Sequence, residues 1–250
     1  MGLLNRLRPG SFTWFELPVG DLQLRVGAPE HFRERLQDDA RIVGLHHTEQ
    51  LEAYVATHSE FATSFVPVPV AAGAPPIVRA MGAAAEAAGI GPMLTFPGAL
   101  AEAVARDLAE RAPHVVVSTE GDTFALHNRP QTYVVEPPTG SARPGLAVRI
   151  VGSRPYAFYS STGRSRVNPG IGHARVVAVL ADHGAVADAA ASAIGLAMLH
   201  PTHVERALEA TIRLHRRLDD RSLRGVVIMA ESHIGVWGEL EIVPAPGRPA

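Results

Sequence analysis

Residues 176–198 read VVAVLADHGAVADAAASAIGLAM, and this stretch decides the class of fold. Its first six residues are a continuous apolar run of the kind that forms a buried strand. The residues from about 185 to 199 then predict a helix, which carries the acidic residue Asp188. We therefore expect a buried strand at 176–181 that leads directly into the helix of Asp188.

The N-terminal half of the chain predicts a hairpin followed by helices. Residues 11–30 are strand-like and turn at Gly20-Asp21. One helix is expected to open at Pro29 and a second to start at Thr48, which has the side chain of a helix cap. The Pro-rich apolar segment 66–76 predicts a packed extended stretch, because proline interrupts a helix interior.

The rest of the chain is predicted to contain both helices and strands. One helix is expected to end at Gly89 and another to begin at Pro97. Further strands are expected at 114–118, 123–126, 132–136, 146–152 and 156–160. A helix capped by Thr202 and a closing hairpin, 225–232 with 236–243, complete the chain. Because strands and helices do not strictly alternate and no internal repeat is evident, we expect an α+β fold of layered helices and sheets.

Composition excludes several kinds of chemistry. The chain has 250 residues, a formal net charge of −2 and no cysteine, and all 23 basic residues are arginine. Thiolate nucleophiles, zinc–thiolate sites, Schiff-base chemistry and the P-loop lysine are therefore excluded. The near-neutral charge gives no reason to expect nucleic acid as a partner. No signal-like or membrane-spanning stretch is evident, so we expect a cytoplasmic protein that does not bind membranes.

The strongest candidate for chemistry is the predicted helix at 185–199. Asp188 and Ser192 are four residues apart, so both project from one helical face. A carboxylate and a hydroxyl provide hard oxygen ligands of the kind that Mg²⁺ prefers. The alternative is that Asp188 caps its own helix or pairs with an arginine such as Arg164 or Arg175, because this spacing is common.

Two loops are weaker candidates for binding a ligand. Gly121-Asp122 lies between two strand-like runs, so the geometry of a turn explains it, but a glycine also lets a ligand approach the backbone. Residues 160–163 read SSTG and combine hydroxyl groups with a permissive backbone near Arg164. Such a loop can bind phosphate oxygens, although similar clusters are more often ordinary surface loops.

In order along the chain, these segments resemble the signatures of a known superfamily. The segments are GIGPM (89–93) with GALAE (98–102), EGD (120–122), SSTG (160–163) and ADAAASA (187–193). Together they resemble the ApbE-like superfamily, and specifically its uncharacterised branch. The likeness runs from about Pro75 to Val243 and is weaker over residues 1–74, so we expect one ApbE-like domain over residues 1–250.

The resemblance implies a fold, ligands and roles for particular residues. Named members of the superfamily have a T-fold-like α+β fold and are FAD:protein FMN transferases that use Mg²⁺ and modify a target protein. It assigns the metal to Asp188 and Ser192. It implies a flavin or nucleotide site that includes the residues Met93, Gly121, Asp122, Ser161, Thr162 and Gly163.

Departures from the family pattern leave the activity open. Glu120 stands where the family has a glycine, Arg164 replaces a histidine, and Arg175 replaces an acid. Three hypotheses follow: a Mg²⁺-dependent enzyme that acts on FAD or a related pyrophosphate, a binding protein for a flavin or small anion without turnover, and a different small-metabolite enzyme. Whether the chain forms a homo-oligomer is left open.

Overall fold

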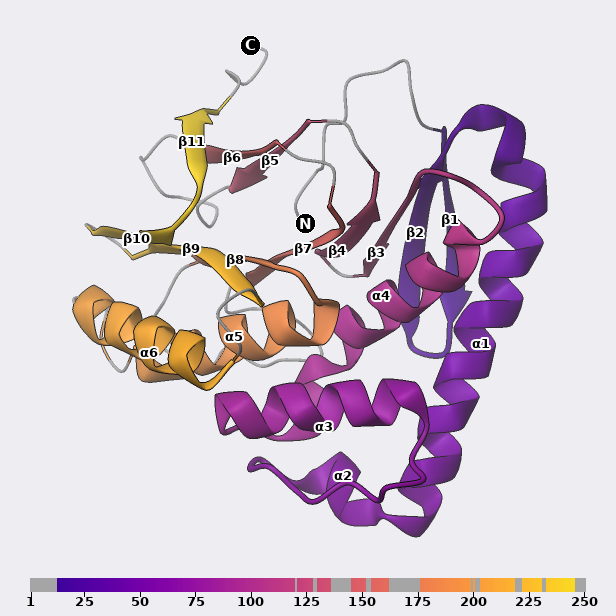
Figure 1. The fold of residues 1–250 in the computed structure, drawn as a ribbon, viewed down its shortest axis with the longest axis horizontal. Coiled ribbons are helices and arrows are strands. Elements are labelled where there is room, and N and C mark those ends of the chain that lie inside the picture. Colours follow the sequence, from indigo (N-terminus) through magenta and orange to yellow (C-terminus); the bar gives the residue numbers. More distant parts are fainter. Residues whose placement is uncertain are drawn as a thin grey trace.

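The computed structural model describes residues 13–119, 121–127, 130–135, 145–151, 154–161, 176–198, 200, 203–218, 222–230 and 233–245. Across these residues, a large antiparallel sheet has helices on one face and a smaller sheet on the other (Figure 1). This mixed, layered arrangement confirms the predicted α+β fold class. Thr162, Gly163, Glu120, Arg164 and Arg175 lie outside the described residues.

The large sheet runs across the whole molecule. Its described strands follow the order β1 (Thr13–Val19), β2 (Leu22–Ala28), β3 (Val115–Thr119), β4 (Asp122–Leu126), β7 (Tyr156–Ser161), β8 (Val176–Ala181), β9 (Leu223–Met229) and β10 (Ile234–Gly238). The smaller sheet has the order β11 (Glu241–Pro244), β6 (Leu146–Ile150) and β5 (Gln131–Val135). Every pair of neighbours in both sheets is antiparallel.

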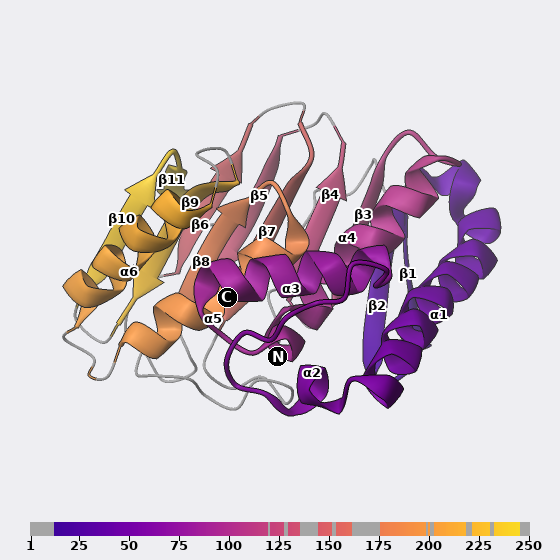
Figure 2. The ribbon, with the colours of Figure 1, turned by 60° about the horizontal axis from the view of Figure 1, so that its bottom comes forward.

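The helices lie on the face of the large sheet away from the small one. They are α1 (Arg33–Thr57), α2 (Ser59–Thr63), α3 (Pro76–Ala88), α4 (Phe96–Ala109), α5 (Gly184–Ala197) and α6 (Val204–Arg217), with short 3₁₀ helices η1 (Glu30–Phe32) and η2 (Pro92–Thr95). Helix α4 contacts β3 and β4, and α5 contacts β7 and β8. Figure 2 shows α3 outside α4 and α5, with α1 flanking the β1–β2 end and α6 the β10 end. The central strands therefore meet two adjacent helices, α4 and α5.

Two cores flank the large sheet. The larger core joins the helices to one face of the sheet, and it contains small side chains where α4 and α5 meet. The second core joins the large sheet to the small one around Tyr133, Tyr156 and Phe158. Burial on both faces explains why β8 is apolar throughout, because neither side of the strand meets water.

The stretch that opened the sequence analysis folds as expected. All six residues of β8 are buried, and the chain passes through Asp182 and His183 into α5. The predicted hairpin turn also forms, with Gly20 at φ +55° between β1 and β2. Helix α3 ends at Gly89, whose left-handed φ of +72° suits a residue without a side chain. These predictions are confirmed.

The predicted break between two N-terminal helices is wrong. Helix α1 is continuous, and Thr48 is buried inside it, where its hydroxyl donates to the carbonyl oxygen of Gly44 at 3.0 Å. Buried residues recur with helical spacing through Leu36, Gly44 and Leu51, so packing of one unbroken face outweighs the capping preference of threonine. Pro29 precedes η1 rather than opening α1 itself.

The predicted closing hairpin is correct only in its first half. Residues 236–243 do not form one strand, because the chain leaves β10 at Gly238 and enters the other sheet as β11. Gly238 has φ +82°, and a side chain there would collide with the backbone of Arg224. Thr202, the expected cap of α6, lies outside the described residues, and the N-cap position is occupied by His203. In the described part of the chain, no helix is long and apolar enough to cross a membrane.

Candidate functional site

The site is built where α4 crosses α5 above β4 and β7. Gly98 of α4 and Gly184 of α5 meet at this crossing, and a side chain on either glycine would collide with the carbonyl oxygen of the other. The helices can approach this closely only because both contact residues lack a Cβ atom. The close crossing brings the first turn of each helix next to the second turn of the other.

Asp188 is the central acid of the site. It is 1% exposed, and its Oδ2 accepts a hydrogen bond from the backbone N–H of Gly98 at 3.2 Å. The first turn of α4 has N–H groups without acceptors inside the helix, and its N-cap residue Thr95 provides no side-chain bond. Asp188 therefore caps α4 from the neighbouring helix, rather than capping its own helix α5.

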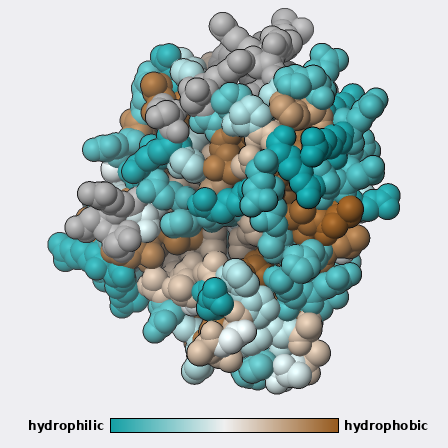
Figure 3. All heavy atoms as spheres, turned by 45° about the vertical axis from the view of Figure 1, so that its right-hand side comes forward, coloured by the Kyte–Doolittle hydropathy of each residue, from teal (hydrophilic) through white to brown (hydrophobic). Residues whose placement is uncertain are grey.

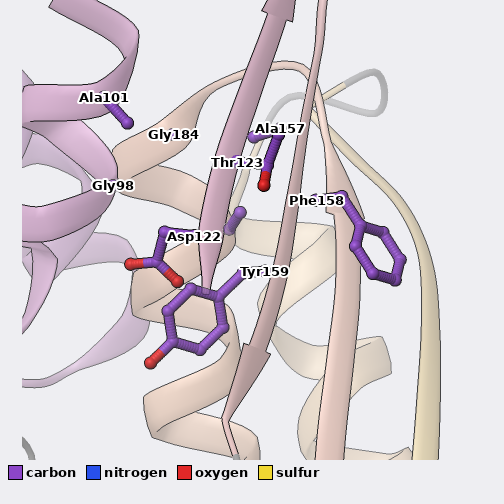
Figure 4. Close-up of a pocket in the computed structure, with 9 residues that line it drawn as sticks. Gly98, Ala101, Asp122, Thr123, Ala157, Phe158, Tyr159 and Gly184 are labelled. Carbon is purple, nitrogen blue, oxygen red and sulfur yellow. The ribbon is translucent and has the colours of Figure 1, made fainter. Parts of the chain in front are cut away.

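A second acid lies against Asp188. Asp122, the first residue of β4, is 4% exposed, and its carboxyl group is hydrogen-bonded to Asp188. The hydroxyl of Tyr159 on β7 bonds to Asp188 as well. Figure 4 shows the Asp122 carboxyl and the Tyr159 ring reaching toward the same region beside the helices. Two buried carboxyl groups therefore share one hydrogen-bonded cluster.

The protonation of this cluster follows from its burial. Burial raises the pKa of Asp188 from 3.8 to about 8, against the opposing effect of the hydrogen bonds from Gly98, Asp122 and Tyr159. None of the described groups that set this pKa is basic. Without a cation, the Asp122–Asp188 pair therefore keeps a proton at neutral pH, because two carboxylates in contact cannot both ionise at low cost.

A third acid, Glu102, occupies the equivalent place on α4 but has different neighbours. Its Oε2 accepts the backbone N–H of Gly184 at 2.6 Å, and its Oε1 lies 3.0 Å from His183 Nδ1 and 2.7 Å from Arg106 Nη2. Burial by itself raises the pKa of Glu102, but the hydrogen bonds from His183 and Gly184 outweigh it, so this pKa is lowered. Glu102 is thus neutralised by basic side chains, whereas Asp188 is not.

The structure places most of the predicted site residues around the acid cluster or at the end of β7. Asp122, Asp188 and Ser192 are buried, and the two acids touch. Gly121 adopts φ +114°, and a Cβ there would lie 3.9 Å from the carbonyl oxygen of Ser160, so the turn lies beside the end of β7. Ser161 ends β7 opposite Val177, and nothing is described of its side chain.

Met93 lies farther along the chain, on η2, and is half-buried against the main core. This short helix contacts α5 and leads directly into α4, so it adjoins the site helices without joining the acid cluster. The sequence analysis assigned no role to Tyr159, Glu102 or His183. A signal for Glu102 was present in the sequence, because GALAE (98–102) matches GAVAD (184–188) position by position in residue type.

Around Asp122 and Asp188, the described residues form a wall with two carboxyl groups rather than a ligand-sized pocket. The notch lined by Gly98, Asp122, Tyr159 and their neighbours is too small to admit a water molecule. No group of three or more acidic or histidine side chains suited to a metal occurs in the part of the chain that the structure describes. A cation at this wall would therefore have two carboxylates at most from these residues.

Comparisons with known proteins identify relatives of this chain. The chain is 35% identical to a UPF0280 protein of Methanopyrus kandleri over 165 residues, which is 65% of each chain. It is 27% identical to a UPF0280 protein of Methanocaldococcus jannaschii over 203 residues, covering 80% of this chain and 81% of the relative. The chain thus spans about two thirds of the first of these relatives.

Solved structures share the fold at low sequence identity. A variant of flavin transferase ApbE from Vibrio cholerae superposes with a TM-score of 0.60 and 11% identity, over 91% of this chain and 97% of that one. Flavinyl transferase ApbE from Pseudomonas stutzeri superposes with a TM-score of 0.56 and 12% identity, over 92% of this chain and 96% of that one.

These matches confirm the resemblance to the ApbE-like superfamily that was inferred from the ordered motifs. The model of one family matches most of the chain, over residues 5–207. The chain belongs to that family, which is described as AbpE bacteria.

Proposed function

We propose that this chain is a Mg²⁺-dependent transferase that takes FAD as donor and passes FMN to a hydroxyl group of a target protein. The observation that carries the proposal is the contact between Asp122 and Asp188, two buried acids from different elements. No described basic side chain contributes to the pKa of Asp188. A buried acid cluster of this kind is suited to a cation that would replace the retained proton.

The chemistry of the side chains fits Mg²⁺. Asp122, Asp188 and Ser192 would hold the ion through carboxylate and hydroxyl oxygens, which are the ligands it prefers. Mg²⁺ also retains open positions for water and phosphate oxygens, which suits a site with few protein ligands. Bound there, it would neutralise the FAD pyrophosphate and stabilise charge on the leaving phosphate.

The residues of the chain would orient the groups of the site and keep water away from them. In the transfer, the hydroxyl oxygen of the target bonds to the phosphorus of the FMN half. The bond from that phosphorus to the bridging oxygen breaks, AMP leaves with the electron pair, and the hydroxyl proton is lost to a base or to water. The N–H of Gly98 and the hydroxyl of Tyr159 hold Asp188 in one orientation. Because this wall is preorganised, little rearrangement is needed when charge develops.

A second candidate is a flavin-binding protein without turnover. The observation that favours it is Glu120, an acid placed directly before Gly121, where the family pattern has glycine. A negative charge at that position would repel a pyrophosphate and hinder the chemistry. This candidate requires flavin binding but no release of AMP.

One experiment separates the two candidates. The purified protein is incubated with FAD, with Mg²⁺ or with EDTA, and the release of AMP and FMN is followed by chromatography. The transferase proposal predicts Mg²⁺-dependent release of AMP, and its loss in Asp188→Asn. Flavin binding by fluorescence without any release of AMP would support the second candidate and contradict the first. The absence of both binding and release would contradict both.

A further inference from the structure

The segment that leads into α3 is unusually apolar. Residues 65–78 read FVPVPVAAGAPPIV and contain no polar side chain. Phe65 is 85% exposed and Val66 is 62% exposed. Figure 2 shows that this segment runs beside α3, the outermost helix of the layer. Exposed aromatic and aliphatic side chains next to one another in sequence are typical of a surface that another molecule covers.

Next to these two residues, the surface is hollowed. A cavity of about 570 Å³ lies between residues 67–72 and the outer face of α3, where Arg79, Gly82, Ala83 and Glu86 line it. Its walls are apolar apart from the two charged residues. Figure 3 shows weakly apolar residues interspersed with hydrophilic ones over the lower half of the face, where Figure 1 places α2 and α3.

The charges on this face of α3 have a simple pattern. Arg79, Ala83 and Glu86 follow each other at intervals of four and three residues, so they share one side of the helix. All three are exposed. Arg79 Nη1 donates to the carbonyl oxygen of Ala74 at 2.7 Å, and neither Arg79 nor Glu86 forms an ion pair with any described residue. A cation and an anion thus border a surface of small side chains.

This pattern is complementary to itself under a two-fold rotation. The midpoint between positions 79 and 86 falls between Gly82 and Ala83, which both line the cavity. If a second α3 lies antiparallel across an axis at that point, Arg79 of each copy faces Glu86 of the other. An interface with a two-fold axis requires this self-complementarity, because each residue meets its counterpart from the same patch.

We propose that this chain forms a two-fold symmetric homodimer through the α3 surface, defined here as residues 65–72 with Arg79, Gly82, Ala83 and Glu86. Ala83, whose exposed side chain is a single methyl group, lets the two helices approach each other at the axis, whereas Gly82 is buried beneath Val70 of its own chain. The exposed Phe65 and Val66 become covered, and the reciprocal Arg79–Glu86 pairs fix the antiparallel register. Charged pairs at the rim of an interface contribute more to register and specificity than to affinity.

The test is a set of charge reversals followed by molar mass in solution, measured by light scattering or sedimentation over a dilution series. The wild-type chain is expected to be a dimer that dissociates on dilution. Arg79→Glu places two acids face to face at both ends of the contact, and Glu86→Arg places two arginines there. Each change alone should weaken the dimer by on the order of tenfold or more, because both symmetry-related pairs become repulsive.

Mixtures make the test specific for the proposed register. Arg79→Glu mixed with Glu86→Arg should form a heterodimer, since each cross-chain pair is again of opposite charge. The double variant Arg79→Glu with Glu86→Arg should recover the dimer by itself. Phe65→Ser should weaken the dimer without changing the pattern of rescue. Arg41→Glu, an exposed charge reversal on α1, serves as the control and should leave the molar mass unchanged.

Two results would overturn the proposal. One is a wild-type chain that stays monomeric at every concentration, which would leave the α3 surface to another partner or to none. The other is a dimer whose dissociation is unaffected by either single reversal, which would place the interface elsewhere. Circular dichroism of each variant confirms folding, and the rescue by mixing cannot arise from misfolded chains.

Discussion

Glu102 and Asp188 each cap the helix that carries the other. Glu102, on α4, accepts the backbone N–H of Gly184 at 2.6 Å, and Asp188, on α5, accepts the backbone N–H of Gly98 at 3.2 Å. Each acid stands four residues after the glycine of its own helix. The two helices thus exchange caps around a contact between two glycines, with approximate two-fold symmetry.

The two halves of this exchange differ in how the charge of the acid is balanced. Glu102 is held by His183 and Arg106, so its charge is balanced within the chain. Asp188 instead meets Asp122 and Tyr159, and burial raises its pKa. The same local geometry therefore produces a neutralised cap on one side and a cluster that would accept a cation on the other.

The glycine contact predicts a large effect on stability. Gly98→Ala and Gly184→Ala each place a methyl group against a backbone carbonyl that cannot move without separating the helices. We expect each change to lower the free energy of unfolding by roughly 2–3 kcal/mol, as overpacking of a close contact does. Urea unfolding measures the change.

Gly73→Ala is the matched control for this prediction. A Cβ at Gly73 would have no atom within 4 Å, so alanine there should leave stability nearly unchanged or raise it slightly. Equal stability of Gly98→Ala and wild type would contradict the close contact described for α4 and α5.

The proposed metal site predicts different outcomes for its carboxylate and its hydroxyl. Asp188→Asn should abolish Mg²⁺-dependent binding of FAD, because the ion is held mainly by charge, whereas Ser192→Ala should only weaken it. Calorimetry with FAD, in Mg²⁺ and in EDTA, measures both. Glu102→Gln removes the equivalent acid and should lower stability while retaining the metal dependence. Full metal dependence in a folded Asp188→Asn protein would remove this acid from the site.

The raised pKa of Asp188 predicts how stability varies with pH in EDTA. The folded state binds the proton of this carboxyl group more tightly than the unfolded state, where its pKa is about 3.9. Its contribution is therefore complete below that value and is lost as pH rises toward about 8, by on the order of a few kcal/mol. Thermal melts between these limits should show the decline, and Asp188→Asn should flatten it. A wild-type profile that rises over this range would contradict the prediction.

The raised pKa of His183 predicts a smaller loss of stability, also with rising pH. The hydrogen bond to Glu102 raises the pKa of His183 above its usual 6.5, although partial burial lowers it. The stabilisation by His183 is complete below pH 6.5 and is lost as pH rises through the raised value. Because about half of the His183 side chain is exposed, the loss should be below about 1 kcal/mol. Melts of His183→Gln at pH 6 and pH 8 should differ less than those of wild type; an equal or larger difference would contradict this.

Sequence reasoning predicted the elements that have strong local signals. The apolar run of β8, the left-handed cap at Gly89 and the turn at Gly20 each have one residue pattern and one physical cause. Thr48 misled the prediction because its hydroxyl can bond equally well to the carbonyl of Gly44 inside a helix. Whether Thr48 caps a helix or lies inside one depends on the burial of a long helical face, which is a tertiary effect.

The candidate site was predicted in part. The acids Asp122 and Asp188 were identified separately, but their contact joins residues 66 positions apart and depends on how α5 packs over β4. The two segments that form the reciprocal caps are similar in sequence, GALAE (98–102) and GAVAD (184–188), although no internal repeat was evident. Five residues are too short to stand out in an alanine-rich chain, and the structure is what relates them.

Glu120 directly precedes Gly121, whose φ is +114°. If a flavin pyrophosphate lies against this turn, Glu120→Gly removes a repelling charge and a side chain together. The removal of repulsion in a partly buried site is worth on the order of 1 kcal/mol, or about fivefold in FAD affinity. Glu120→Gln is the control, because it removes the charge but keeps the bulk. Fluorescence titration with FAD should give tighter binding for both variants if charge dominates, and only for Glu120→Gly if the side chain blocks the ring. Unchanged or weaker binding in Glu120→Gly would count against a flavin at this turn.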